Sequence, residues 1–123
     1  MTFTTKISGI VGIAALLFAA GVKETHAERP LSIVVAYTAG GTTDTIARII
    51  GARLQEKLGR PVIIENKAGA TGQIGSRYVA KADPDGSTIQ IATQTTHAVA
   101  PSLYGQIGYD PIKDFTPIIL AAW

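Results

Sequence analysis

Hydrophobic residues change their spacing along the chain, and each spacing predicts a different element. Residues 31–37 form an almost continuous apolar run rich in β-branched residues, which is typical of a strand covered on both faces of a parallel sheet. Apolar residues at every third or fourth position then predict a helix from Thr42 to Leu58, ended by Gly59. A second short apolar run over residues 61–65 predicts another strand.

The predicted first helix has one apolar side and one charged side. Thr42 or Thr43 is expected to cap its start, and Asp44 lies in the first turn, where the helix dipole favours a negative charge. The apolar side consists of Ile46, Ala47, Ile49, Ile50, Leu54 and Leu58. This side is expected to cover the sheet.

The strand and helix pattern repeats in the next part of the chain. We expect a loop over residues 66–72, a helix over 73–82, a turn over 83–86 and a strand over 87–93. The second helix is expected to face inward with Ile74, Tyr78 and Val79. The resulting β-α-β-α-β order predicts an α/β fold with a parallel sheet and right-handed crossovers.

The pattern weakens after the third predicted strand. We expect a polar loop over 94–105 with a short helix near 99–104, irregular chain over 109–115 and a fourth strand over 118–122. This last apolar run reaches Trp123 without a polar tail. Because domains seldom end inside a core element, the chain is expected to be truncated.

The first 27 residues are interpreted as a cleavable signal peptide. Lys6 precedes an apolar run from Ile7 to Val22, and Thr25-His26-Ala27 has small residues at the usual cleavage positions. A retained membrane anchor is the alternative, but the run is shorter than the roughly 20 residues that span a bilayer. We therefore expect residues 28–123 to be a soluble periplasmic or secreted product.

Composition excludes several function classes. The formal net charge is only +2, and no basic stripe predicts a nucleic-acid partner. The chain has no cysteine, and His97 is the one histidine after residue 27, so neither a disulfide nor a metal site is expected. No cofactor is expected either, because Gly69, Gly72 and Gly75 have neither the dinucleotide nor the P-loop spacing.

Three loops at the carboxyl ends of the predicted strands form the candidate binding region. They are Thr38–Asp44, Asn66–Gly72 and Thr93–Ala98. In the first loop, Gly40 and Gly41 precede a helix start, whose free backbone N–H groups and positive dipole end suit a carboxylate or phosphate. A tight turn that needs glycine for backbone reasons alone is an equal alternative at this point.

An exported α/β enzyme remains the alternative to a binding protein. A hydrolase or transferase would use Asp44 or His97 on a bound acid. No G-x-S-x-G sequence surrounds any serine, however, so His97 lacks an activated nucleophile beside it in the sequence pattern. We expect Asp44 to organise its loop and His97 to make hydrogen bonds, and no residue is predicted to be catalytic.

Several motifs in order resemble the Bug family, the periplasmic substrate-binding receptors of tripartite tricarboxylate transporters. They are Ala39-Gly40-Gly41-Thr42-Thr43-Asp44, the segment from Val62 to Gly75, Ala82-Asp83-Pro84-Asp85-Gly86, His97-Ala98 and Tyr109-Asp110-Pro111-Ile112-Lys113-Asp114-Phe115. The resemblance extends from about Pro30 to Trp123. One departure is Ala36-Tyr37-Thr38-Ala39, where the family often has a proline-rich segment.

The resemblance implies a two-domain, Venus-flytrap (type II) periplasmic binding protein about three times as long as residues 28–123. These residues would be the N-terminal part of its first substrate-binding lobe, and the second domain is missing here. It implies a monomer that binds small organic acids and delivers them to membrane transporter subunits. The implied ligand contacts are Tyr37, Thr38, Ala39, Gly40, Gly41, Thr42 and Asp44 in the first loop, Ala70, Thr71 and Gly72 in the second, and Thr93, Gln94, Thr95 and His97 in the third.

Overall fold

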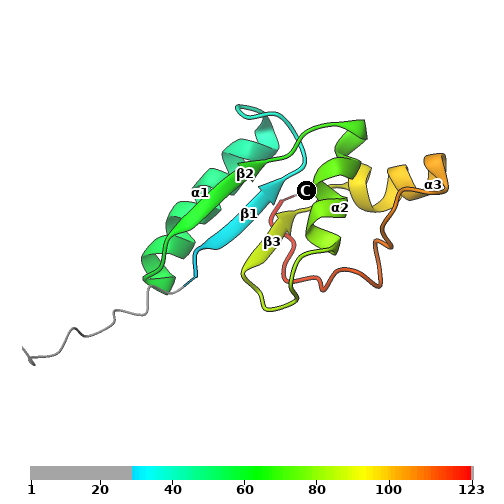
Figure 1. Cartoon of the computed structure of the whole chain (residues 1–123). Helices are drawn as coiled ribbons and strands as arrows, with labels where there is room; N and C mark the ends of the chain where they lie inside the picture. Colours follow the sequence, from blue (N-terminus) through cyan, green and yellow to red (C-terminus); the bar gives the residue numbers. More distant parts are fainter. Residues whose placement is uncertain (1–28, 123) are drawn as a thin grey trace, which may run out of the picture.

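A computed structural model describes residues 29–122 (Figure 1). The elements in chain order are β1 (Leu31–Val35), α1 (Thr42–Leu58), β2 (Val62–Asn66), the 3-10 turn η1 (Ala70–Gly72), α2 (Gln73–Ala80), β3 (Thr88–Ile91), the π-helical turn η2 (Thr95–Val99) and α3 (Ala100–Tyr104). The predicted signal peptide and its alternative, a membrane anchor, lie outside the described residues.

The three strands form a parallel sheet in the order β2-β1-β3, as the sequence predicts. Ile33 pairs with Ile64 on one side and with Ile89 on the other. This central position buries β1 on both faces, which explains its almost continuous apolar sequence.

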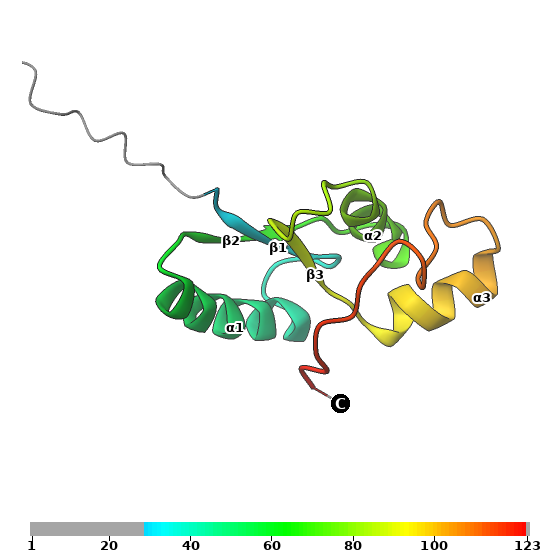
Figure 2. The same ribbon diagram turned by 90° about the horizontal axis from the view of Figure 1, so that it is seen from below.

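Helix α1 covers one face of the sheet (Figure 2). Leu31, Ile33 and Val35 of β1 pack there with the buried Ala47. The prediction was wrong at Ile49 and Leu58, which are 62% and 46% exposed. The buried residues of α1 are Ala47, as predicted, together with Asp44 and Gly51, and the small Ala47 and Gly51 allow the helix to approach the strands closely.

Helix α2 lies on the opposite face of the sheet (Figure 2). Its buried residues are Gly75 and Ser76, whereas Ile74 and Tyr78, predicted to face inward, are 48% and 44% exposed. A Cβ atom on Gly75 would lie 2.9 Å from the Ala36 Cα atom. The distance between this helix and the sheet therefore requires glycine at the contact, which an apolar pattern does not reveal.

The short helix predicted near 99–104 is confirmed as α3, but the residues before it, predicted as a polar loop, are helical as well. The π-helical turn η2 continues directly into α3, so residues 95–104 are helical throughout. The Ala100 N–H donates to the Thr95 carbonyl, five residues back, and the next residue, Pro101, has no N–H to donate. A wider turn before a proline avoids part of the steric conflict that a regular α-helix would have there.

The fourth predicted strand is absent from the part of the chain that the structure describes. Residues 115–122 adopt no regular structure, and Ile118, Ile119 and Leu120 are 75%, 84% and 71% exposed. A strand forms through hydrogen bonds to a neighbouring strand, and no described residue of 118–122 makes such a bond. Apolar content alone therefore gave a wrong prediction here.

The helices within residues 29–122 are too short or too polar to cross a membrane.

Candidate functional site

The loops that follow the three strands meet at the carboxyl edge of the sheet. The Tyr37 hydroxyl lies 2.6 Å from the Thr93 hydroxyl, which joins the first loop to the third. The Asn66 amide joins the end of β2 to the first loop by donating to the Tyr37 carbonyl at 3.3 Å. Because β1 lies between β2 and β3, chain segments from both neighbouring strands reach its carboxyl end.

The first loop leads into an α1 N-terminus that no side chain caps. Gly41 occupies the N-cap position, and neither Thr42 nor Thr43 makes the capping bond expected from the sequence. Gly40 has a φ of 86°, a left-handed conformation that glycine adopts without strain. Thr42 is exposed, and the N–H groups of a helix's first turn have no partner within the helix, where the positive end of the dipole lies.

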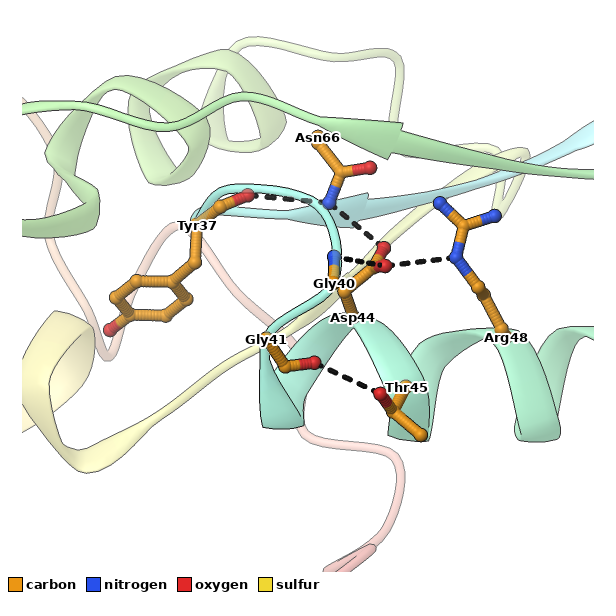
Figure 3. A network of polar contacts seen from close by, with 7 residues as sticks. All are labelled: Tyr37, Gly40, Gly41, Asp44, Thr45, Arg48 and Asn66. Carbon is orange, nitrogen blue, oxygen red and sulfur yellow. Dashed lines mark hydrogen bonds and ion pairs between the residues drawn. The ribbon is translucent and has the colours of Figure 1, made fainter.

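A buried carboxylate holds this loop in place (Figure 3). Asp44 is 3% exposed, and its side chain accepts hydrogen bonds from the Gly40 N–H at 2.8 Å, Arg48 Nε at 2.9 Å and Asn66 Nδ2 at 2.9 Å. The bonds from Arg48, from the Gly40 backbone and from Asn66 lower the pKa of Asp44 from 3.8 to about 2. The carboxylate is therefore charged, and both of its oxygens accept hydrogen bonds from protein donors.

The second loop contains an unusual backbone conformation. Ala70 and Thr71 have φ values of 46° and 56°, which residues other than glycine rarely adopt. Gly72 follows with a φ of 84°, and a Cβ atom there would lie 2.5 Å from Thr96 Cγ2. Strained residues often occur at binding sites, where the surrounding contacts hold them in place.

The third loop starts the helical segment with reciprocal hydrogen bonds. The Thr93 N–H donates to the Thr96 hydroxyl oxygen at 3.1 Å, and the Thr96 N–H donates to the Thr93 hydroxyl oxygen at 3.4 Å. This is the geometry of a capping box. Thr96 is fully buried, so the Thr93 hydroxyl that contacts Tyr37 is fixed from both sides.

His97 packs against aromatic side chains from the C-terminal segment. Its ring lies 4.6 Å from the Phe115 ring centroid in an edge contact, and its Nδ1 atom lies 2.9 Å from the Thr96 hydroxyl. Burial lowers the pKa of His97 below its ordinary value of 6.5. The imidazole is therefore neutral at pH 7, and the described residues place no serine nucleophile in contact with it.

The predicted ligand contacts differ in their exposure. Those that are exposed are Thr38, Ala39, Gly40, Gly41, Thr42, Ala70, Thr71 and Gln94. Those that are partly buried are Tyr37, Thr93, Thr95 and His97, and the two that are buried are Asp44 and Gly72. The structure thus brings the three loops together. The exposed residues are accessible to a ligand, whereas the buried ones can only support the loops.

Three residues that support the loops are not among the predicted contacts, although Asn66 and Thr96 lie within the predicted loops. Asn66 and Arg48 both bind Asp44, and Thr96 completes the capping box with Thr93. The signals were present, because Arg48 lies four residues after Asp44 and Thr96 lies three residues after Thr93. The contact from Asn66 depends on the strand register and has no local signal.

Residues 29–122 contain neither a cluster of metal ligands nor a hollow at the three loops. No group of three potential metal ligands occurs among these residues. A shallow hollow of about 520 Å³ lies on the α2 side, and its walls include Arg29, Ser32, Glu65 and Lys81. None of its lining residues belongs to the three loops, so the hollow is separate from the candidate site.

Comparison with known proteins decides the family. The sequence profile of the tripartite tricarboxylate transporter family receptors matches residues 46–122. The chain belongs to this family. The receptor chain is similar to the solved periplasmic binding protein BugD, with 45% identity and a TM-score of 0.70, over 74% of this chain and 30% of BugD.

Two other solved relatives of this receptor chain come from Rhodopseudomonas palustris. MatC, solved with bound malate, is 43% identical, with a TM-score of 0.70, over 73% of this chain and 31% of MatC. Rpa4515, solved with adipate, is 47% identical, with a TM-score of 0.72, over 75% of this chain and 31% of Rpa4515. The fold is thus the parallel α/β lobe of a periplasmic binding protein, as the resemblance implied.

The receptor chain spans about a third of the length of the curated and solved relatives that it matches.

Proposed function

We propose that this chain forms part of a periplasmic receptor that binds small organic carboxylates for a tripartite tricarboxylate transporter. The observation that carries the proposal is the exposed, uncapped N-terminus of α1 at the meeting point of three polar loops. Backbone N–H groups there can donate to a carboxylate, and the helix dipole favours its negative charge.

The character of the loops supports a carboxylic acid as the ligand. The predicted contacts include no lysine or arginine, so the charge of the ligand would be met by N–H groups and neutral hydroxyls. The structures of two relatives were solved with malate and with adipate, and both acids are small dicarboxylic acids. We assign direct contacts to the exposed loop residues and a supporting role to Asp44, whose oxygens are occupied within the protein.

The remaining parts of the proposal concern the whole protein. Residues 1–27 would direct export and be removed, placing the mature chain in the periplasm. The receptor would act as a monomer and release its acid to the membrane subunits of the transporter. It would bind its ligand without transforming it, because the hydroxyl that contacts His97, that of Thr96, is fully buried and donates to the Thr93 carbonyl.

The substitution Thr42→Pro tests the central contact. Proline is favoured at the first position of a helix, and Gly41 before it has the extended conformation, φ −78° and ψ 174°, that proline requires. The substitution should therefore remove one N–H group without disturbing α1. Thr42→Ala is the matched control, because it removes the hydroxyl and keeps the N–H.

Affinity for adipate and malate is measured by NMR titration of the purified chain, which detects binding in the millimolar range. We expect Thr42→Pro to weaken binding by about tenfold or more relative to Thr42→Ala, the effect of losing a hydrogen bond to a charged group. Equal affinities of the two variants would contradict a carboxylate at this helix end. Conversion of the acid to a product, abolished by His97→Ala, would instead support the enzyme alternative.

A further inference from the structure

The geometry of the carboxyl edge points to Asn66 as a positioning residue for the carboxylate site. We infer that its side-chain amide fixes the Gly40–Asp44 loop relative to the end of β1, and so aims the first-turn N–H groups of α1. This inference rests on the proposed function. It assigns Asn66 no direct contact with the ligand.

Asn66 uses one nitrogen atom to join two parts of the first loop. Its Nδ2 atom lies 2.9 Å from Asp44 Oδ1 and 3.3 Å from the Tyr37 carbonyl oxygen. An amide nitrogen carries two hydrogens, so both donors are occupied. Tyr37 lies where the chain leaves β1, and Asp44 lies in the first turn of α1, so the amide spans both ends of the loop (Figure 3).

The two oxygens of Asp44 have different partners. Oδ1 accepts from Asn66, whereas Oδ2 accepts from the Gly40 N–H and from Arg48 Nε. The bond to Asn66 therefore sets the rotation of the carboxylate that in turn holds the Gly40 backbone. Because Asp44 is 3% exposed, loss of the Asn66 donor would leave a charged oxygen without water to replace it.

The backbone around Asn66 has its own hydrogen bonds, independent of this side chain. Asn66 pairs with Val35 in the sheet, and the Lys67 N–H donates to the Val35 carbonyl at 2.8 Å. The end of β2 should thus remain in register when the side chain changes. A substitution at this position is therefore expected to disturb the loop and leave the sheet intact.

Two substitutions separate the hydrogen bond from the size of the side chain. Asn66→Ala removes both donors. Asn66→Asp keeps the shape but places a second carboxylate beside Asp44 at neutral pH, and regains one O–H donor when it is protonated in acid. Thr45→Ala is the control, because it removes an exposed side-chain bond to the Gly41 carbonyl in the same loop.

The experiment titrates the full chain and each variant with adipate and malate by NMR, at about pH 8 and about pH 5, and records unfolding by urea in the same buffers. At the higher pH we expect affinity to fall by roughly tenfold in Asn66→Ala and further in Asn66→Asp, the scale of losing a buried donor to a charged group. The ratio of Asn66→Asp to wild-type affinity should rise at the lower pH. Thr45→Ala should bind like the wild type.

Each other outcome has a definite meaning. Wild-type affinity in both Asn66 variants would overturn the inference and leave the proposed function standing. Failure of the wild-type chain to bind either acid would overturn the proposed function, and the inference with it. An affinity loss in Asn66→Asp that does not change with pH would also overturn the inference. So would an affinity loss that is explained entirely by the smaller folded fraction of the variant, as measured by urea unfolding. A result that needs no ligand would also support the inference. The Gly40 amide should exchange its hydrogen faster in Asn66→Ala than in Thr45→Ala.

Discussion

At the scale of single residues, the candidate site separates charged groups from the surface offered to a ligand. Asp44 is buried among three donors, and its nearest cation, Arg48, is directed at it. The exposed loop residues carry neutral side chains or none. A negatively charged ligand would thus meet N–H groups and hydroxyls, while the one carboxylate of this loop is screened by its partners.

The environment of Asp44 predicts a specific pH dependence of stability. Its folded pKa of about 2 lies below the ordinary value of 3.8, so the unfolded chain binds a proton more readily. The stabilisation is therefore complete above about pH 4 and is lost as the pH falls through about 2. Urea unfolding of Asp44→Asn and wild type should show a difference that is constant from neutral pH to about 4 and shrinks below it. A difference that grows in acid would contradict the assigned hydrogen bonds.

At the scale of elements, the sequence predicted the first three strands and the helices α1 and α2, but only some of the residues that face the sheet. The apolar run of β1 and the period of α1 reflect local geometry, so both elements were found close to their observed bounds. The faces of both helices were partly misassigned, because glycine, alanine and serine form the contacts where a helix lies closest to the strands. Hydrophobicity marks large side chains and does not register such close contacts.

The close packing of α2 can be tested with a pair of glycine substitutions. Gly75→Ala would place a Cβ atom 2.9 Å from the Ala36 backbone, which cannot easily move, and we expect a loss of about 1–3 kcal/mol in the free energy of unfolding. Gly51→Ala in α1 is the comparison, because its nearest neighbour is the flexible end of the Ile64 side chain at 3.0 Å. We expect a much smaller change there. Urea unfolding that ranks the two variants the other way would show that α2 can move away from the sheet.

The candidate loops were also predictable in part. Their positions followed from the strand ends, because parallel strands place their carboxyl ends at one edge. The start of the helix at Thr93 and Thr96 was missed although its spacing is local, whereas the bond from Asn66 to Asp44 joins residues 22 positions apart. Contacts between residues far apart in the sequence, such as this bond, depend on the register of β1 and β2, which the sequence pattern does not specify.

At the scale of the whole molecule, the chain spans about a third of the length of its relatives, and the three loops lie at the carboxyl edge of one sheet. In the family, as the resemblance implies, a second domain closes over the ligand. A single lobe would supply only part of the contacts and none of the closure. The affinity of residues 28–123 for organic acids should therefore be very weak.

Calorimetric titration of residues 28–123 with adipate and malate tests this expectation. Heat signals too weak to fit, with binding detected only by NMR at millimolar acid, would agree with a one-lobe contact surface. Micromolar affinity would show that residues 28–123 contain a complete site and would contradict the two-domain account.

Chemical-shift mapping of the backbone amides during titration with adipate is the most direct test of the central claim. The account predicts that the largest shifts occur at Gly41, Thr42 and Thr43, at the uncapped start of α1, with smaller shifts in the Ala70–Gly72 turn. Shifts confined to residues around the separate hollow, such as Arg29 and Lys81, or no shifts at millimolar acid, would contradict a carboxylate site at these three loops.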